Sequence, residues 1–129
     1  MAVLRHHSPD GPHAPFGKYS HAVEIPAGAR LLMCSGQLGI TAEDEIPDDV
    51  EVQAVLCFEA IGRFLAAADM DFSNLVRVNA YVTDRAFMQP YMRARDRYVA
   101  SPPPASTLMI VSGFTRPEFK VEVEIVAAK

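Results

Sequence analysis

The sequence predicts an α+β domain, in which a mixed sheet of about six strands carries two α-helices on one face. Three observations lead to this class. Strand-like and helix-like patterns both occur along the chain, its 129 residues suffice for one domain, and its hydrophobic content of 50% is ordinary for a globular fold. We expect an irregular N-terminal arm at residues 1–16 and a single domain at residues 17–129.

The first strands are predicted on either side of a turn. Residues 19–25 alternate loosely and end at Pro26-Ala27-Gly28, which is a turn signal. Residues 30–35 form a short apolar run that Gly36 stops. Together the two segments predict a hairpin.

A helix is predicted from Asp48 or Asp49 to about Ala68. An aspartate suits the N-cap, and Glu51 in the first turn complements the helix dipole. Apolar residues at spacings of 4, 3 and 4 form one stripe toward the core. These residues are Ala54, Phe58, Ile61 and Leu65.

The clearest strand pattern covers residues 75–83, where apolar and polar side chains alternate. Asp84 then caps a second helix at roughly residues 85–99. Tyr91, Arg95 and Tyr98 lie along one side of this helix.

Two strands complete the predicted sheet. A proline-rich connector at residues 101–105 leads into a strand at 107–112, and a turn at 113–118 leads into a strand at 119–127. In the last strand, Glu122 and Glu124 face away from the apolar set.

The second face of the sheet is expected to be covered by other subunits. Two helices can cover only one face, yet the segments 31–34 and 107–112 are apolar on both faces. An exposed apolar surface of several hundred Å² is unusual in a monomer. The residues therefore predict an oligomer.

Composition argues against several classes of function. The net charge of −4 does not favour nucleic-acid binding, which usually needs a basic surface. No apolar run approaches the roughly 18 residues of a membrane span, and the N-terminus lacks the apolar core of a signal peptide. We therefore expect a soluble, cytoplasmic protein without nucleic-acid or membrane partners.

The cysteines and histidines predict no metal site. Cys34 and Cys57 have no zinc-ligand spacing, and they are predicted to be reduced, buried thiols, with a catalytic Cys34 as the alternative. His6, His7 and His13 lie in the arm, where no carboxylate or cysteine completes a ligand set.

Four short segments carry groups suited to chemistry, and their order matters more than any one of them. They are Gly-Lys-Tyr-Ser at 17–20, Cys-Ser-Gly-Gln at 34–37, Pro-Ala-Ser-Thr at 104–107 and Val-Glu-Val-Glu at 121–124. With the helix and strand between them, they resemble the RidA/YjgF family over residues 17–127. The resemblance implies a chorismate-mutase-like fold and a homotrimer with small-molecule clefts between subunits.

The resemblance also implies an activity and its residues. The archetypes of the family hydrolyse reactive enamines and imines, such as 2-aminoacrylate, to a ketoacid and ammonia, and the resemblance implies no metal or organic cofactor. Glu122 corresponds to the catalytic carboxylate that activates water, a contribution worth roughly 10²–10⁴-fold. Tyr19 corresponds to a tyrosine of the substrate site, and Ser35 and Gly36 belong to a ligand-contacting motif.

The sequence departs from the family at two positions. Ser106 stands where imine deaminases carry an arginine that binds the substrate carboxylate, and Tyr91 stands where they carry an asparagine. Loss of the arginine should weaken carboxylated imines about 10- to 100-fold unless another cation replaces it. Arg116, His21 or an arm histidine are candidates for that role.

The sequence leaves three candidate functions for the protein. The first is an enamine/imine hydrolase with an altered substrate range, which the retained Glu122 and Tyr19 favour. The second is a homotrimer that binds a small metabolite without hydrolysing it, which Ser106 favours. An endoribonuclease or translation inhibitor is the least favoured because the chain is acidic and lacks a basic-aromatic stripe.

Overall fold

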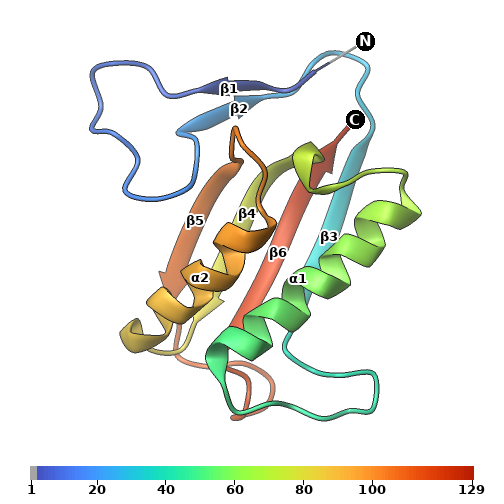
Figure 1. The fold of residues 1–129 in the computed structure, drawn as a ribbon, viewed down its shortest axis with the longest axis vertical. Coiled ribbons are helices and arrows are strands. Elements are labelled where there is room, and N and C mark those ends of the chain that lie inside the picture. Colours follow the sequence, from blue (N-terminus) through green and yellow to red (C-terminus); the bar gives the residue numbers. More distant parts are fainter. Residues whose placement is uncertain (1–2) are drawn as a thin grey trace.

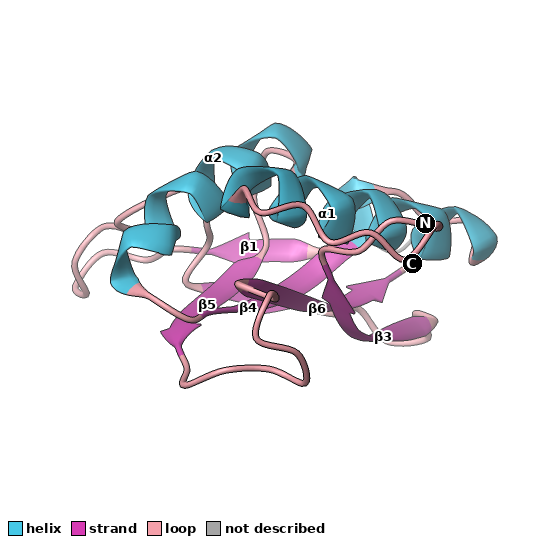
Figure 2. Cartoon of the chain, turned by 90° about the horizontal axis from the view of Figure 1, so that it is seen from below, coloured by secondary structure: helices cyan, strands magenta, loops and turns pink. Residues whose placement is uncertain are grey.

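The computed structural model describes residues 3–129 and arranges them as a sheet covered on one side by two helices (Figures 1 and 2). The main sheet has the strand order β3-β6-β4-β5, with β4 and β5 parallel and the other pairs antiparallel. The predicted α+β class is confirmed. The strands are β1 (Arg5–His7), β2 (Ala22–Glu24), β3 (Leu31–Leu38), β4 (Leu75–Val82), β5 (Ala105–Ile110) and β6 (Val121–Ala128).

Both predicted helices form, with small differences at their ends. Helix α1 spans Val50–Ala67, and the Asp49 side chain caps it by accepting a hydrogen bond from the backbone of Val52. The second segment divides into a 3-10 turn, η2 (Arg85–Phe87), and helix α2 (Met88–Tyr98). Asp84 caps the 3-10 turn rather than the α-helix. Another short 3-10 turn, η1 (Phe72–Asn74), precedes β4.

The hydrophobic core lies between the helices and the inner face of the main sheet. All four residues of the predicted α1 stripe have no exposed surface, and alternate residues of β4 and β6 meet them. Helix α2 adds Tyr91 and Ala94 to the same core. No helix within residues 3–129 has the length and apolar character needed to cross a membrane.

The predicted hairpin between residues 19–25 and 30–35 is wrong. β2 pairs with β1 in a separate two-stranded ribbon, whereas β3 pairs with β6 and continues it at Arg30, whose backbone exchanges two hydrogen bonds with Lys129. β3 packs Leu32 and Cys34 against the core, whereas the only partly buried residue of β2 is Val23, so burial favours the pairing of β3 with the apolar strand β6.

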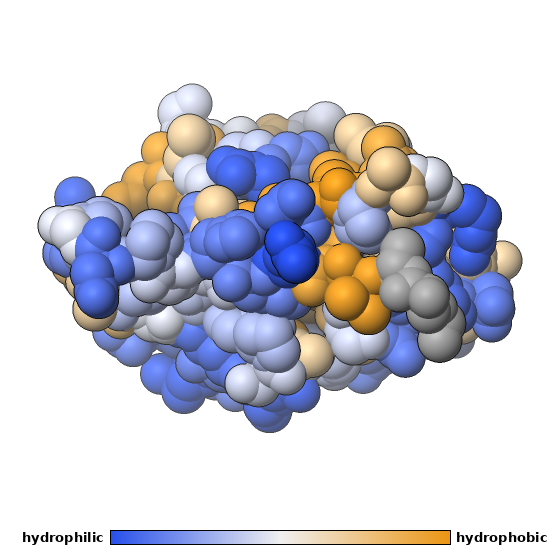
Figure 3. Space-filling model, turned by 90° about the horizontal axis from the view of Figure 1, so that it is seen from above, coloured by the Kyte–Doolittle hydropathy of each residue, from blue (hydrophilic) through white to orange (hydrophobic). Residues whose placement is uncertain are grey.

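The N-terminal arm is therefore not wholly irregular, because it supplies β1. The ribbon lies across the end of the main sheet where the chain's C-terminus also lies (Figure 1). Seen from this end, the surface is mostly hydrophilic, with hydrophobic residues showing in separate places at the upper left and to the right of centre (Figure 3). The ribbon covers the end of the sheet, and Tyr19 lies in the loop that joins its two strands.

The outer face of the sheet, away from the helices, is apolar at its edges and polar at its centre. Leu31 and Met33 on β3 are 59% and 71% exposed, and Met109 on β5 is 52% exposed. Polar side chains of β4 and β6 occupy the centre of this face. The exposed apolar side chains therefore lie on the two edge strands, which contain most of the segments 31–34 and 107–112 that the sequence shows as apolar on both faces.

Candidate functional site

Glu122 lies on the outer face of β6, opposite Leu38 of β3 on one side and Tyr81 of β4 on the other. The register between β3 and β6 shifts between Cys34 and Gln37, and Gly36 lies in this irregular stretch. A Cβ atom at Gly36 would stand only 2.7 Å from the Glu122 carboxylate carbon and its Oε2. The carboxylate therefore rests directly against a backbone that only glycine leaves open.

The environment of Glu122 favours its protonated form. Partial burial raises the pKa of the Glu122 carboxyl above its ordinary value, and the neighbouring negative charge of Glu124 raises it further. A carboxylate with a raised pKa is a stronger base and can also return the proton that it takes. Two of the predicted site residues, Glu122 and Gly36, are thus brought together, and Ser35 is the next residue along β3.

A hydrogen-bonded strip continues across the outer face beside Glu122. The carboxylate of Glu124 accepts from the Tyr81 hydroxyl at 2.7 Å and from the Asn79 amide at 3.3 Å. Arg77 donates to the Asn79 amide oxygen at 2.8 Å and to the Thr107 hydroxyl at 2.7 Å. The sequence shows these residues only as the polar side of a strand, so their network was not predicted.

Tyr19 and Ser106 meet in a second place, at the free edge of β5. Ser20 ties the two segments together, because its backbone donates to the Pro104 carbonyl at 2.9 Å and its hydroxyl donates to the Pro103 carbonyl at 2.6 Å. Tyr19 and Ser106 both line a cavity of about 320 Å³. The other residues that line it are Phe16, Gly17, Met88, Met92, Arg95 and Leu108.

Arg95 is the charged group of this cavity, and the sequence did not single it out. Its side chain comes from α2 and is almost wholly buried, with 4% of the residue exposed. Its Nε and Nη2 atoms both contact Oδ1 of Asp96, at 3.0 and 2.9 Å. The sequence feature that could have identified Arg95 is its position on the same side of the helix as Tyr91, where a charged residue is unusual.

The two groups of residues lie on opposite faces of the sheet. Ser106 is level with Val78, which faces the helices, whereas Glu122 is level with Tyr81 on the outer face. β4 separates their strands, so they are about 10 Å apart across the sheet and about as far along it. A single chain does not bring Glu122 to Tyr19 and Ser106.

Two other predicted residues lie elsewhere. Tyr91 has no exposed surface and packs beside Phe58 in the core. This position contradicts the expectation that Tyr91 contacts a ligand. The Tyr91 side chain points inward because Tyr91 lies on the side of α2 that covers the sheet. Arg116, in the segment after β5, lines a different cavity with Phe119, and its Nη2 lies 3.7 Å from Oδ1 of Asp44.

The thiols and histidines also take defined positions. Burial raises the pKa of both thiols, that of Cys57 to about 12, which argues against Cys34 as an activated nucleophile. His21 contacts the backbone of His13 at 2.7 Å and stacks edge-on with Tyr19, outside the Arg95 cavity lining. No cluster of three or more possible metal ligands occurs within residues 3–129.

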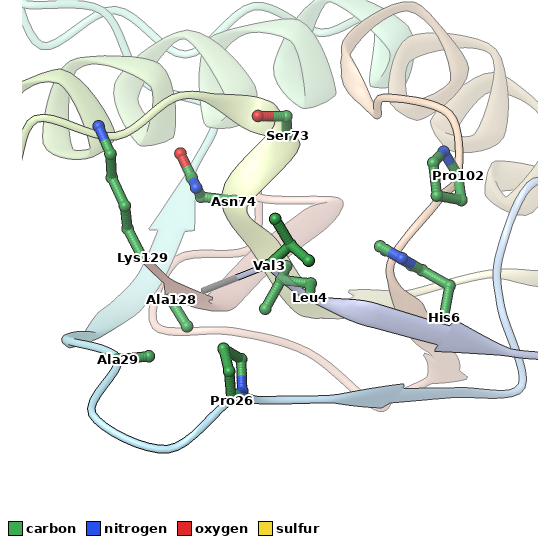
Figure 4. A pocket seen from close by; sticks show the side chains of 10 residues that line it. All are labelled: Val3, Leu4, His6, Pro26, Ala29, Ser73, Asn74, Pro102, Ala128 and Lys129. Atoms are coloured by element: carbon green, nitrogen blue, oxygen red, sulfur yellow. The ribbon is translucent and has the colours of Figure 1, made fainter. Parts of the chain in front are cut away.

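A further cavity, of about 270 Å³, lies where the arm meets the end of the sheet (Figure 4). Side chains from the arm, from η1 and from the C-terminus surround it, including His6, Asn74 and Lys129. None of the predicted site residues lines this cavity. The candidate site therefore consists of the Glu122 group and the Tyr19–Ser106–Arg95 group.

Comparison with known proteins decides the family. A family model described as Endoribonuclease L-PSP matches residues 11–129. The chain belongs to this family. The prediction of RidA/YjgF membership, made from four short segments, is confirmed, and the matched range covers all of the candidate site residues.

Relatives and solved structures match over nearly the whole chain. Protein DfrA of Myxococcus xanthus is 33% identical over 129 residues, which cover 98% of this chain and 96% of that protein. The 2-iminobutanoate/2-iminopropanoate deaminase of Mus musculus is 27% identical and covers 90% of this chain and 84% of its own. The Rid-family protein YyfB of Yersinia pestis, a protein of unknown function, superposes with a TM-score of 0.86 at 26% identity, covering 98% of both chains.

Proposed function

We propose that this RidA/YjgF-family protein hydrolyses reactive enamine or imine intermediates to a carbonyl compound and ammonia. The observation that carries the proposal is the Glu122 carboxylate, partly buried, raised in pKa and held against Gly36. A relative that is 27% identical bears the name of an iminoacid deaminase, which supports the same reaction class.

The chemistry needs one group that takes a proton and gives it back. When the nitrogen of the C=N bond carries a proton, a water oxygen adds to the electrophilic carbon and the Glu122 carboxylate accepts a proton from that water. The product is a neutral carbinolamine, with a hydroxyl and an amino group on one carbon. The Glu122 carboxyl returns its proton to the amino group, the C–N bond breaks and ammonia leaves, and the hydroxyl proton passes to the Glu122 carboxylate as the C=O bond forms.

We further propose that the active cleft forms between subunits of a homotrimer. Glu122 and Tyr19 belong to opposite faces of one chain, so they meet only if the outer face of one subunit approaches the β5 edge of the next. Exposed apolar side chains on both edge strands support such contacts. Light scattering should then give about three times the 14.1 kDa chain mass.

Mixing two inactive variants tests the shared cleft directly. Glu122→Gln and Tyr19→Ala chains each lack one half of every cleft. Co-expression in equal amounts should restore about a quarter of the wild-type activity, because one cleft in four then receives both intact residues by chance. Mixed trimers with no more activity than either variant would show that each cleft belongs to one chain.

The test of the reaction is ammonia release from 2-iminopropionate and from an uncharged imine. Glu122→Gln should lower the rate about 10²–10⁴-fold. Glu43→Gln, at an exposed loop position, serves as the control and should keep the wild-type rate. Equal background rates for the wild type and Glu122→Gln would refute the hydrolase.

Non-catalytic metabolite binding is the second candidate, and Ser106 is the observation that favours it. Without the strand arginine, carboxylated imines lose a charge-assisted contact that deaminases of the family make. A wild-type protein that binds small ligands but releases no ammonia from either imine would establish this alternative.

A further inference from the structure

We propose that Arg95 is the anion-binding residue of the cavity at the β5 edge, and that its ligand is a small carboxylate with an apolar body. The proposal rests on the proposed function in one respect, since it takes this cavity as part of the ligand cleft. It assigns to a helix residue the charge that the family places on the strand at position 106.

The burial of Arg95 calls for an anion. The Arg95 side chain is only 5% exposed, and burial of a charged side chain is costly unless other charges or hydrogen-bond partners replace the lost water. Its partner Asp96 sits with a side chain that is 47% exposed, and both contacts use the single oxygen Oδ1. Among residues 3–129, the side-chain hydrogen bonds of Arg95 use Nε and Nη2, so the Nη1 donors remain for a ligand.

The surroundings hold the guanidinium at the cavity wall. Its carbon lies 5.9 Å from the Tyr91 ring centroid, so the ring supports the cation from the core side. A Cβ at Gly17 would approach Nη2 to 3.4 Å, so the arm backbone passes close to the charge without covering it with a side chain. Ser106 is small, and it leaves room in front of Arg95 that an arginine at this position would occupy.

The rest of the cavity wall is apolar and adaptable. Met88 and Met92 come from α2, Leu108 from β5 and Phe16 from the arm. Methionine side chains adjust to ligands of different shape. A volume of about 320 Å³ lies at the lower end of the range for small-molecule cavities, about 300–1,000 Å³. One charged group beside four apolar ones fits a short carboxylate with a hydrocarbon chain.

A matched pair of probes separates charge from shape. Isothermal titration with 4-methylpentanoate and with its uncharged amide should show binding of the acid well above that of the amide. Arg95→Met should weaken the acid about 10- to 100-fold, the loss expected for one charge-assisted contact, and leave the amide unchanged. Arg97→Met is the control, because Arg97 is exposed and pairs with Glu51 outside this cavity.

Asp96→Asn provides a variant that acts in the opposite direction. It removes the competing carboxylate and frees Arg95, so the acid should bind several-fold more tightly. An arginine that serves only to pair with Asp96 predicts no gain. If Arg95→Met fails to fold, the Asp96→Asn result decides alone: tighter binding supports the proposal, and equal or weaker binding overturns it.

The remaining outcomes are equally decisive. Equal affinity of the wild type for acid and amide, absence of acid binding, or a folded Arg95→Met protein with wild-type affinity would each overturn the role of Arg95. A wild-type protein that binds the acid through Arg95 but releases no ammonia from imines would refute the hydrolase and leave this inference standing.

Discussion

Replacing Gly36 by alanine should displace the Glu122 carboxylate while leaving the fold intact. The added Cβ would stand 2.7 Å from the carboxylate carbon and Oε2, whereas ordinary contacts begin at 3.4 Å, so the carboxylate must withdraw by about 0.7 Å. Misplacement of a reacting group by about 1 Å can cost about 10²-fold. We therefore expect kcat for imine hydrolysis to fall about 10- to 100-fold, with a smaller change in KM.

The assay is ammonia release under saturating imine, with thermal unfolding measured in parallel. The atoms that must move belong to the end of a flexible side chain, so the midpoint of unfolding should change little. Gly113→Ala is the matched control, because a Cβ there meets nothing within 4 Å. A folded Gly36→Ala protein with a kcat within twofold of the wild type would refute the idea that the position of Glu122 limits the reaction.

Three further predictions concern stability, pH and thiol reactivity. Gln53 is fully buried and makes three hydrogen bonds to backbone groups, so Gln53→Leu should lower the free energy of unfolding by about 3 kcal/mol in urea titration, while exposed Gln89→Leu should change it little. Glu124→Gln removes a charge that raises the Glu122 pKa, so the acid limb of the pH–rate profile should move to lower pH; an unmoved limb would contradict this cause. Because the pKa of Cys57 is about 12, its thiol should resist alkylation at pH 8 until the protein is denatured, and rapid native labelling would contradict its burial.

The sequence predicted the elements in which apolar side chains recur at a regular spacing. The α1 stripe and the alternation in β4 and β6 each repeat often enough that only one face can enter the core. β2 shows why pairing is harder to predict. Its three residues carry one partly buried apolar side chain, Val23, so local pattern does not distinguish a partner in the arm from a partner in the sheet.

The sequence could predict site residues that lie in strand motifs. It could not predict which residues of α2 a ligand can reach, because that depends on how the helix is rotated against the sheet. Glu122 and Gly36 sit on paired strands, so their motifs carry them to one place. Tyr91 and Arg95 are one turn apart on α2, yet Tyr91 lies wholly in the core and Arg95 reaches the cavity. Sequence places both on one side of the helix, but packing against Phe58 and the arm decides which of them a ligand can touch.

With Arg95 in its proposed role, the cavity at the β5 edge has a positive charge although position 106 is a serine. Arg95 already contacts Oδ1 of Asp96 through two of its nitrogen atoms. A ligand carboxylate must therefore compete with an internal one, which lowers affinity for small anions and makes it depend on ionic strength through the half-exposed Asp96. The apolar residues around Arg95 offset that loss only for ligands with a hydrocarbon body. Selectivity in this cleft thus follows from the combination of one shared cation with an apolar wall, and it favours larger carboxylates over the smallest ones.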